Sequence, residues 1–124
     1  MEHADINEKN RPAARDWRFE RSTRLFGATA MGKLAESHVA VFGLGGVGSY
    51  AVEGLARSGV GKLTLVDFDK VCITNINRQL HAVSGTVGKL KAALMAERVR
   101  EINPRAEIRA VEAFYDKTTS AELL

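Results

Sequence analysis

Three short apolar runs recur along the chain, and segments of helical periodicity separate them. The runs cover residues 38–42, 63–66 and 107–111, and apolar residues recur at intervals of three and four over about residues 49–58 and 87–102. Short apolar runs predict buried strands, and the three- and four-residue spacing predicts helices. This βαβαβ order predicts a Rossmann-like α/β unit with a parallel sheet and right-handed crossover connections.

The two crossover helices have different candidate packing faces. We expect the first helix to pack against the sheet through Val47, Ala51 and Leu55, with the small residues Gly54 and Ala56 allowing a close approach. In the second helix, capped by Thr86, four residues fall on one face: Ala92, Met95, Val99 and Ile102. Asn103 and Pro104 should end it.

The flanks of this unit have weaker patterns. Residues 1–16 are polar and lack periodicity, which predicts a flexible N-terminal arm. Residues 17–34 predict one or two short helices outside the sheet, because Gly27 and Gly32 interrupt the apolar positions. Residues 116–124 begin what we expect to be another helix. The predicted domain therefore covers residues 17–124.

Composition narrows the class of protein. The chain has 124 residues, of which 45% are hydrophobic and 27% charged, as expected for one globular domain. It lacks the run of about 20 apolar residues that a membrane span needs, and its N-terminus lacks a signal-peptide core, so we expect a cytoplasmic location. The formal net charge of +3 is compatible with an anionic ligand such as a nucleotide or RNA.

A glycine turn carries the first functional signal. Four glycines, Gly43, Gly45, Gly46 and Gly48, lie between the first strand and its helix. In such a turn glycines allow a sharp reversal, close approach of a phosphate and tight helix packing. Asp67 follows the second strand, where a carboxylate can bind a ribose. This predicts a nucleotide site; the alternative is a βαβ unit whose glycines serve packing alone.

The long connection after the second strand adds charge to this site. Ligands bind parallel sheets at the carboxyl ends of the strands, where this connection emerges. It carries Asp69, Asn75 and Arg78, and Lys91 follows it. A dinucleotide site has only a pyrophosphate to hold, whereas a triphosphate carries more charge, so the added cations favour phosphoryl or nucleotidyl transfer.

Four motifs in register give the chain a family resemblance. Residues 43–48 read GLGGVG, residues 65–69 LVDFD, residues 75–79 NINRQ and residues 86–91 TVGKLK. The combination resembles the adenylating superfamily of ubiquitin-activating enzymes, which includes the adenylyltransferases of molybdopterin and thiamin biosynthesis. Within it, RLFG at 24–27, VCITN at 71–75, RQLHA at 78–82 and INP at 102–104 are similar to the branch that dehydrates threonylcarbamoyladenosine in tRNA.

The resemblance implies an ATP site with assigned roles. The four glycines would line the phosphates and Asp67 would bind the ribose hydroxyls. Asn75, Arg78 and Lys91 would contact the triphosphate, with Arg78 and Lys91 as the catalytic residues. Arg21 would reach across a homodimer into the partner's site, with Arg24 as the alternative. Asp69 would either face the site or cap the loop.

The resemblance also implies a reaction. A carboxylate on the tRNA adenosine would attack the α-phosphate of ATP, and the acyl-adenylate would close to a cyclic, dehydrated product. The aspartate that binds Mg²⁺ is expected beyond Leu124, so the chain would be the N-terminal half of a larger adenylating domain. The catalytic cysteine of the ubiquitin-activating branch is likewise expected further on, so Cys72 is expected to be a half-buried structural thiol. For His81, which lies in a loop, we expect a surface or packing role; the alternative is that it approaches a phosphate.

Three other functions stay open. One is an adenylyltransferase that activates the C-terminal glycine of a ubiquitin-like sulfur carrier protein, which would add a sulfur-transfer partner. Another is an NAD-dependent oxidoreductase, which would give Arg78 and Lys91 no role. The third is a non-catalytic nucleotide-binding or dimerisation module.

Overall fold

The computed structural model describes residues 16–123. The arm predicted for residues 1–16 therefore lies, apart from Asp16, outside the described residues. A 3₁₀ helix, η2 (Trp17–Phe19), leads into α1 (Glu20–Phe26) and α2 (Ala28–Glu36), as predicted for this region. Gly27 separates the two α-helices with a φ of +88°, in the left-handed region that favours glycine.

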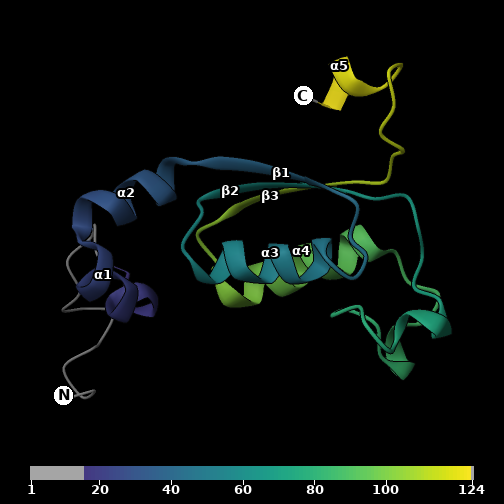
Figure 1. Ribbon diagram of the computed structural model, residues 1–124, viewed down its shortest axis with the longest axis horizontal. Coiled ribbons are helices and arrows are strands. Elements are labelled where there is room, and N and C mark those ends of the chain that lie inside the picture. The colour runs from purple at the N-terminus through teal and green to yellow at the C-terminus, as the bar shows by residue number, and fades with distance from the viewer. Residues whose placement is uncertain (1–15, 124) are drawn as a thin grey trace.

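The sheet has three parallel strands, β1 (His38–Phe42), β2 (Lys62–Val66) and β3 (Glu107–Val111), in the order β1-β2-β3. The predicted strands are confirmed, with β2 one residue longer at its start. The crossover helices α3 (Gly48–Arg57) and α4 (Lys91–Ile102) lie side by side on one face of the sheet (Figure 1). The fold is thus the predicted Rossmann-like α/β unit.

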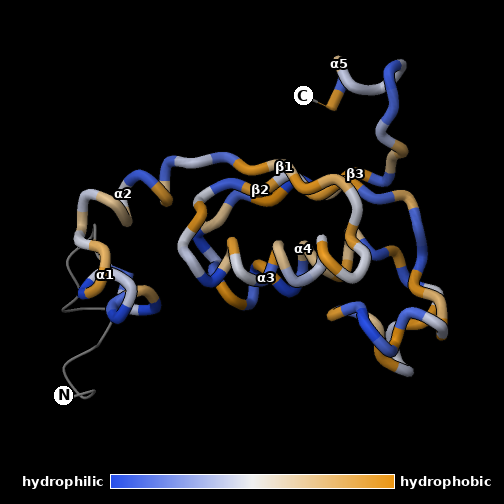
Figure 2. The backbone as a smooth tube through the Cα atoms, viewed as in Figure 1, coloured by the Kyte–Doolittle hydropathy of each residue, from blue (hydrophilic) through white to orange (hydrophobic). Residues whose placement is uncertain are grey.

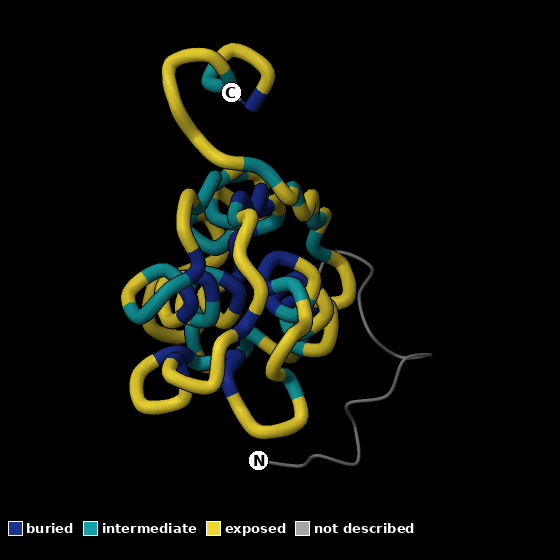
Figure 3. Tube along the Cα trace, turned by 90° about the vertical axis from the view of Figure 1, so that its right-hand side faces the viewer, coloured by how far each residue is buried: buried dark blue, intermediate teal, exposed yellow. Residues whose placement is uncertain are grey.

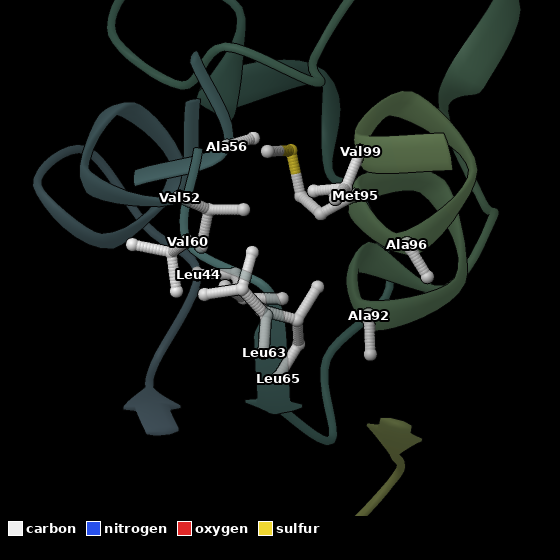
Figure 4. Close-up of a cluster of buried hydrophobic side chains, with 10 residues drawn as sticks. All are labelled: Leu44, Val52, Ala56, Val60, Leu63, Leu65, Ala92, Met95, Ala96 and Val99. Atoms are coloured by element: carbon white, nitrogen blue, oxygen red, sulfur yellow. The ribbon is translucent and has the colours of Figure 1, made fainter. Parts of the chain in front are cut away.

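The core fills the space between this face and the two helices. In the edge-on view of the sheet, apolar positions of α3 and α4 turn toward the strands (Figure 2), and the buried residues form a central band (Figure 3). Met95 reaches from α4 toward α3 (Figure 4). The buried cluster consists of Leu44, Val52, Ala56, Val60, Leu63, Leu65, Ala92, Met95, Ala96 and Val99.

The packing face predicted for α3 is confirmed only in part. Ala56 is buried and Leu55 packs against the core, as predicted. Val47, however, is 86% exposed and Ala51 is exposed, and Ser49 and Val52 are buried in their place. The turn sets the rotation of the helix, because Gly48 is pressed against Gly43 at the end of β1. By contrast, the predicted face of α4 is confirmed, with Ala92, Met95 and Val99 buried.

The predicted start of α4 is also wrong, by four residues. Residues 87–90 pair with the preceding loop: the Gly88 N–H donates to Val71 O at 2.9 Å, and the Val71 N–H donates to Lys89 O at 2.8 Å. The hydroxyl of Thr86 donates to His81 O instead of capping the helix. Helical geometry therefore begins only at Lys91.

The C-terminal segment leaves the sheet after β3. The last helix, α5 (Ser120–Leu123), stands apart from the layers in both views (Figures 1 and 3). It begins later than predicted because the Asp116 carboxylate accepts the N–H groups of Thr118 and Thr119 in a turn. None of the helices in the described part of the chain is both long and apolar enough for a membrane crossing.

Candidate nucleotide site

The candidate site lies at the carboxyl ends of the strands. There the glycine turn 43–48 connects β1 to α3, and the long loop 67–90 connects β2 to α4, on the right of Figure 1. The loop contains two 3₁₀ helices, η3 (Ile73–Asn75) and η4 (Ser84–Thr86). Topology alone therefore brings both predicted motifs to one end of the sheet.

The four glycines of the turn fall into two pairs. Gly43 has a φ of +91°, and a Cβ on Gly48 would lie 1.8 Å from the Gly43 carbonyl oxygen. The fold itself therefore requires these two glycines. A Cβ on Gly45 or Gly46 would meet its nearest neighbour, Gln79 or Arg78, only at 3.7 or 3.6 Å, an ordinary contact. Close packing within the chain therefore does not require glycine at these two half-buried positions.

The turn also presents free backbone donors. The N–H groups of residues 45–48 have no acceptor among the described residues. They stand at the start of the ten-residue helix α3, where the helix dipole is positive. Such a row of N–H groups binds phosphate and other anions.

Asp67 fastens this turn to the end of β2. Its Oδ2 accepts the Leu44 N–H at 2.7 Å, and its Oδ1 accepts the Asp69 N–H at 2.7 Å. Each carboxylate oxygen has a further lone pair, so these bonds leave acceptor capacity for a ribose. The predicted ribose contact stays a prediction; holding the turn is a second role that the sequence did not reveal.

The loop 67–90 holds its own shape and joins the turn. The buried Asn75 accepts the Cys72 N–H on Oδ1 at 2.9 Å. Ser49 is completely buried; its hydroxyl donates to Gly45 O at 2.5 Å and accepts the Leu80 N–H at 3.2 Å. Ser49 was not among the predicted site residues, and the only signal for it is its place directly after the last glycine.

The two predicted catalytic cations differ in environment. Arg78 is exposed, and its Nη1 donates to Thr74 O at 3.1 Å and Asn77 Oδ1 at 2.8 Å. Lys91 is buried, and its Nζ lies 4.0 Å from Oδ2 of the exposed Asp69, too far for a hydrogen bond. The Lys91 side chain is 7% exposed and its ammonium makes no hydrogen bond among the described residues, so it can pair with an anionic ligand.

Two remaining predictions concern Arg21 and metal binding. Arg21 lies on α1, at the opposite end of the sheet from the glycine turn (Figure 1). One chain does not bring Arg21 to the site, and its proposed reach into a partner stays a prediction. The alternative, Arg24, pairs with Glu20 on the same helix at 3.3 Å. The described residues contain no group of three or more metal-binding side chains.

Cys72 is exposed, so the expectation of a half-buried thiol is wrong. The pKa of the thiol lies below its ordinary value, first because the Thr74 hydroxyl donates to Sγ, at 3.2 Å. The backbone N–H groups of Thr74 and Ile73 and the positive charge of Lys91 act in the same direction. All of these contacts stabilise the thiolate.

We predict that Cys72 reacts with iodoacetamide at lower pH than an ordinary thiol, because a depressed pKa increases the thiolate fraction. The rate of alkylation, followed by mass spectrometry against pH, should have its midpoint below that of the same chain in guanidinium. Thr74→Val should move the midpoint upward. Coincident profiles for the folded and denatured chains would contradict the assignment.

We predict opposite effects for two glycine substitutions in α3. Gly48→Ala should destabilise the chain by about 1–3 kcal/mol or more, because its Cβ would collide with the Gly43 carbonyl. Gly54→Ala should stabilise it by about 0.5–1 kcal/mol, because nothing lies within 4 Å and alanine favours the helix. Denaturant unfolding measures both; equal effects would refute the close packing of Gly48.

Comparison with known proteins matches most of the chain. The model of the ThiF family matches residues 19–124. The chain is 48% identical over 107 residues to the tRNA threonylcarbamoyladenosine dehydratase of Haemophilus influenzae, covering 86% of this chain and 41% of that protein. The dehydratase of Bacillus subtilis is 52% identical over 101 residues, which are 82% of this chain and 40% of that protein.

A solved structure matches the fold. The crystal structure of the Escherichia coli tRNA N6-threonylcarbamoyladenosine dehydratase, TcdA, in complex with ATP superposes with a TM-score of 0.84 at 44% identity. The match covers 94% of this chain and 46% of that one, so the chain spans less than half the length of these relatives. With its glycine turn, its cationic loop and the family match in agreement, the chain belongs to the ThiF family.

Proposed function

We propose that this chain binds ATP and serves the adenylation step of a tRNA threonylcarbamoyladenosine dehydratase. The observation that carries the proposal is the row of free N–H groups at residues 45–48, at the same end of the sheet as the buried Lys91. Both features suit a ligand with several negative charges. The relatives named above, one of them crystallised with ATP, support the same ligand.

Each predicted site residue has a part in this proposal. The free N–H groups of Gly45 and Gly46 bind the phosphates, while Gly43 and Gly48 shape the turn. Asp67 holds the ribose, and Asn75 contacts the triphosphate beside Arg78 and Lys91. Asp69 acts through its loop, where its carbonyl accepts the Lys91 N–H at 3.1 Å.

The proposed reaction is nucleotidyl transfer followed by ring closure. A carboxylate oxygen of the threonylcarbamoyl group attacks the α-phosphate of ATP, and pyrophosphate leaves. An internal nucleophile then attacks the acyl-adenylate carbon and releases AMP, so the tRNA loses one water overall. Arg78 and Lys91 neutralise the charge that develops on the departing pyrophosphate. The chain supplies position and charge, without a covalent nucleophile.

The proposal extends to partners that one chain does not supply. Mg²⁺ would accompany ATP as the counterion of its phosphates. A homodimer would bring Arg21 of a second copy to the site. Two large apolar side chains are exposed beside the site: Val47 in the turn, at 86% exposure, and Tyr50 on α3, at 54%. Their burial in an interface would favour such an association.

Calorimetry with ATP, AMP and NAD tests the ligand. We expect ATP to bind more tightly than NAD, because Lys91 adds a positive charge that can pair with the additional phosphate. Lys91→Met should cost about 1.5–3 kcal/mol of ATP binding, roughly a 10- to 150-fold rise in Kd, and less for AMP. Lys33→Met, on an exposed position of α2, is the control. Equal or tighter NAD binding would refute the proposal.

A turnover assay on the full-length protein tests the proposed substrate. We expect pyrophosphate release from ATP to depend on tRNA that contains threonylcarbamoyladenosine, and the nucleoside to lose one water in mass spectrometry. Arg78→Ala should lower turnover by about a hundred- to thousand-fold while changing ATP binding far less. Activation of a ubiquitin-like carrier protein instead of the tRNA would select the alternative adenylyltransferase.

A further inference from the structure

Leu44 is held at three points inside the glycine turn. Its side chain is completely buried in the core cluster (Figure 4), and its N–H donates to Asp67. Its carbonyl oxygen lies 2.7 Å from Nε2 of His81, which is 37 residues away in sequence. A carbonyl oxygen only accepts, so His81 carries a proton on Nε2 and donates it to Leu44.

We propose that His81 is a positioning residue that aims the backbone donors of the turn at the nucleotide. In a trans peptide the C=O and the following N–H point in opposite directions. By holding the Leu44 carbonyl toward the protein interior, His81 turns the Gly45 N–H outward. This inference rests on the proposed function, because the donors it orients are those that would bind the phosphates of ATP.

The next peptide in the turn is held in the same way. The Gly45 carbonyl accepts both the Ser49 N–H, at 3.1 Å, and the Ser49 hydroxyl, at 2.5 Å. The Gly46 N–H, on the other side of that peptide, is therefore also turned away from these bonds. His81 and Ser49 act on successive carbonyls, and the N–H groups opposite both carbonyls have no acceptor among the described residues.

His81 is itself fixed well enough for this task. It is 5% exposed, and its backbone carbonyl accepts the Thr86 hydroxyl at 2.7 Å. Its Nδ1 is buried without a hydrogen-bond partner among the described residues, so the bond to Leu44 is the one that orients the ring. A histidine that only filled space would not depend on where its N–H lies.

The position of the donor gives a sharp test. In His81→Gln the side-chain amide nitrogen can occupy the place of imidazole Nε2, whereas in His81→Asn the shorter amide reaches only the place of Nδ1. His81→Leu removes the donor and keeps an apolar side chain. His38→Leu is the matched control, because His38 makes a 2.7 Å bond to Thr64 at the amino end of β1, away from the turn.

ATP binding of the 124-residue chain is measured by calorimetry, with thermal unfolding alongside. We expect His81→Asn and His81→Leu to raise Kd by about tenfold or more, since a lost oriented donor costs roughly that factor. His81→Gln should stay within about threefold of the wild type, and His38→Leu should match it. If the leucine variant does not fold, the glutamine and asparagine pair still decides.

The outcomes distinguish the positioning role of His81 from the proposed binding of ATP. If the wild type binds ATP but the glutamine and asparagine variants bind it equally well, the positioning role is refuted while the proposed function stands. The same conclusion follows if binding falls only in proportion to thermal stability in all variants. A wild type that does not bind ATP would refute the proposed function and this inference together.

Discussion

The candidate site depends on the 2.7 Å hydrogen bond between the Leu44 N–H and the Asp67 carboxylate. It joins the turn after β1 to the end of β2, and the two bonded residues are 23 positions apart in the sequence. The Gly43 N–H, which donates to Val66 O at 2.8 Å, and His81, which donates to Leu44 O, anchor the same turn at two further points. Because the Leu44 side chain belongs to the hydrophobic core, the bond also couples the position of the turn to the packing of α3 and α4.

This arrangement gives each group in the turn a separate task. Gly43 and Gly48 meet the steric needs of the fold, while Gly45 and Gly46 supply free backbone donors. The carbonyl groups of the turn bind inward, to His81 and Ser49. Preorganised donors of this kind bind an anion without first giving up bonds within the protein, which is the physical basis of electrostatic catalysis.

The sequence predicted the strands and the general place of the site because these follow from local patterns. Each strand is a short apolar run between turn residues, and parallel strands bring their carboxyl ends together whatever the details. The sequence-based prediction failed where contacts between residues distant in sequence determine the bounds or the orientation of a helix. The start of α4 is displaced because residues 87–90 bond to Val71, and the exposed face of α3 is set by the contact between Gly48 and Gly43.

The roles of Ser49 and His81 could not be predicted for the same reason. Their partners, Leu80 and Leu44, lie 31 and 37 residues away along the chain. A buried histidine and a buried serine have no distinguishing sequence pattern of their own, since both residue types also occur in turns and on surfaces. Only the folded chain identifies them as the residues that hold successive carbonyls of the turn.

Amide hydrogen exchange, followed by NMR with and without ATP, tests the central claim most directly. A preorganised turn predicts a protected Leu44 N–H in the free chain and rapid exchange at Gly45, Gly46 and Val47. ATP should then slow exchange at those three positions and leave Leu44 unchanged. Rapid exchange at Leu44 in the free chain would contradict the account, and so would exchange rates at Gly45, Gly46 and Val47 that do not change when ATP is added.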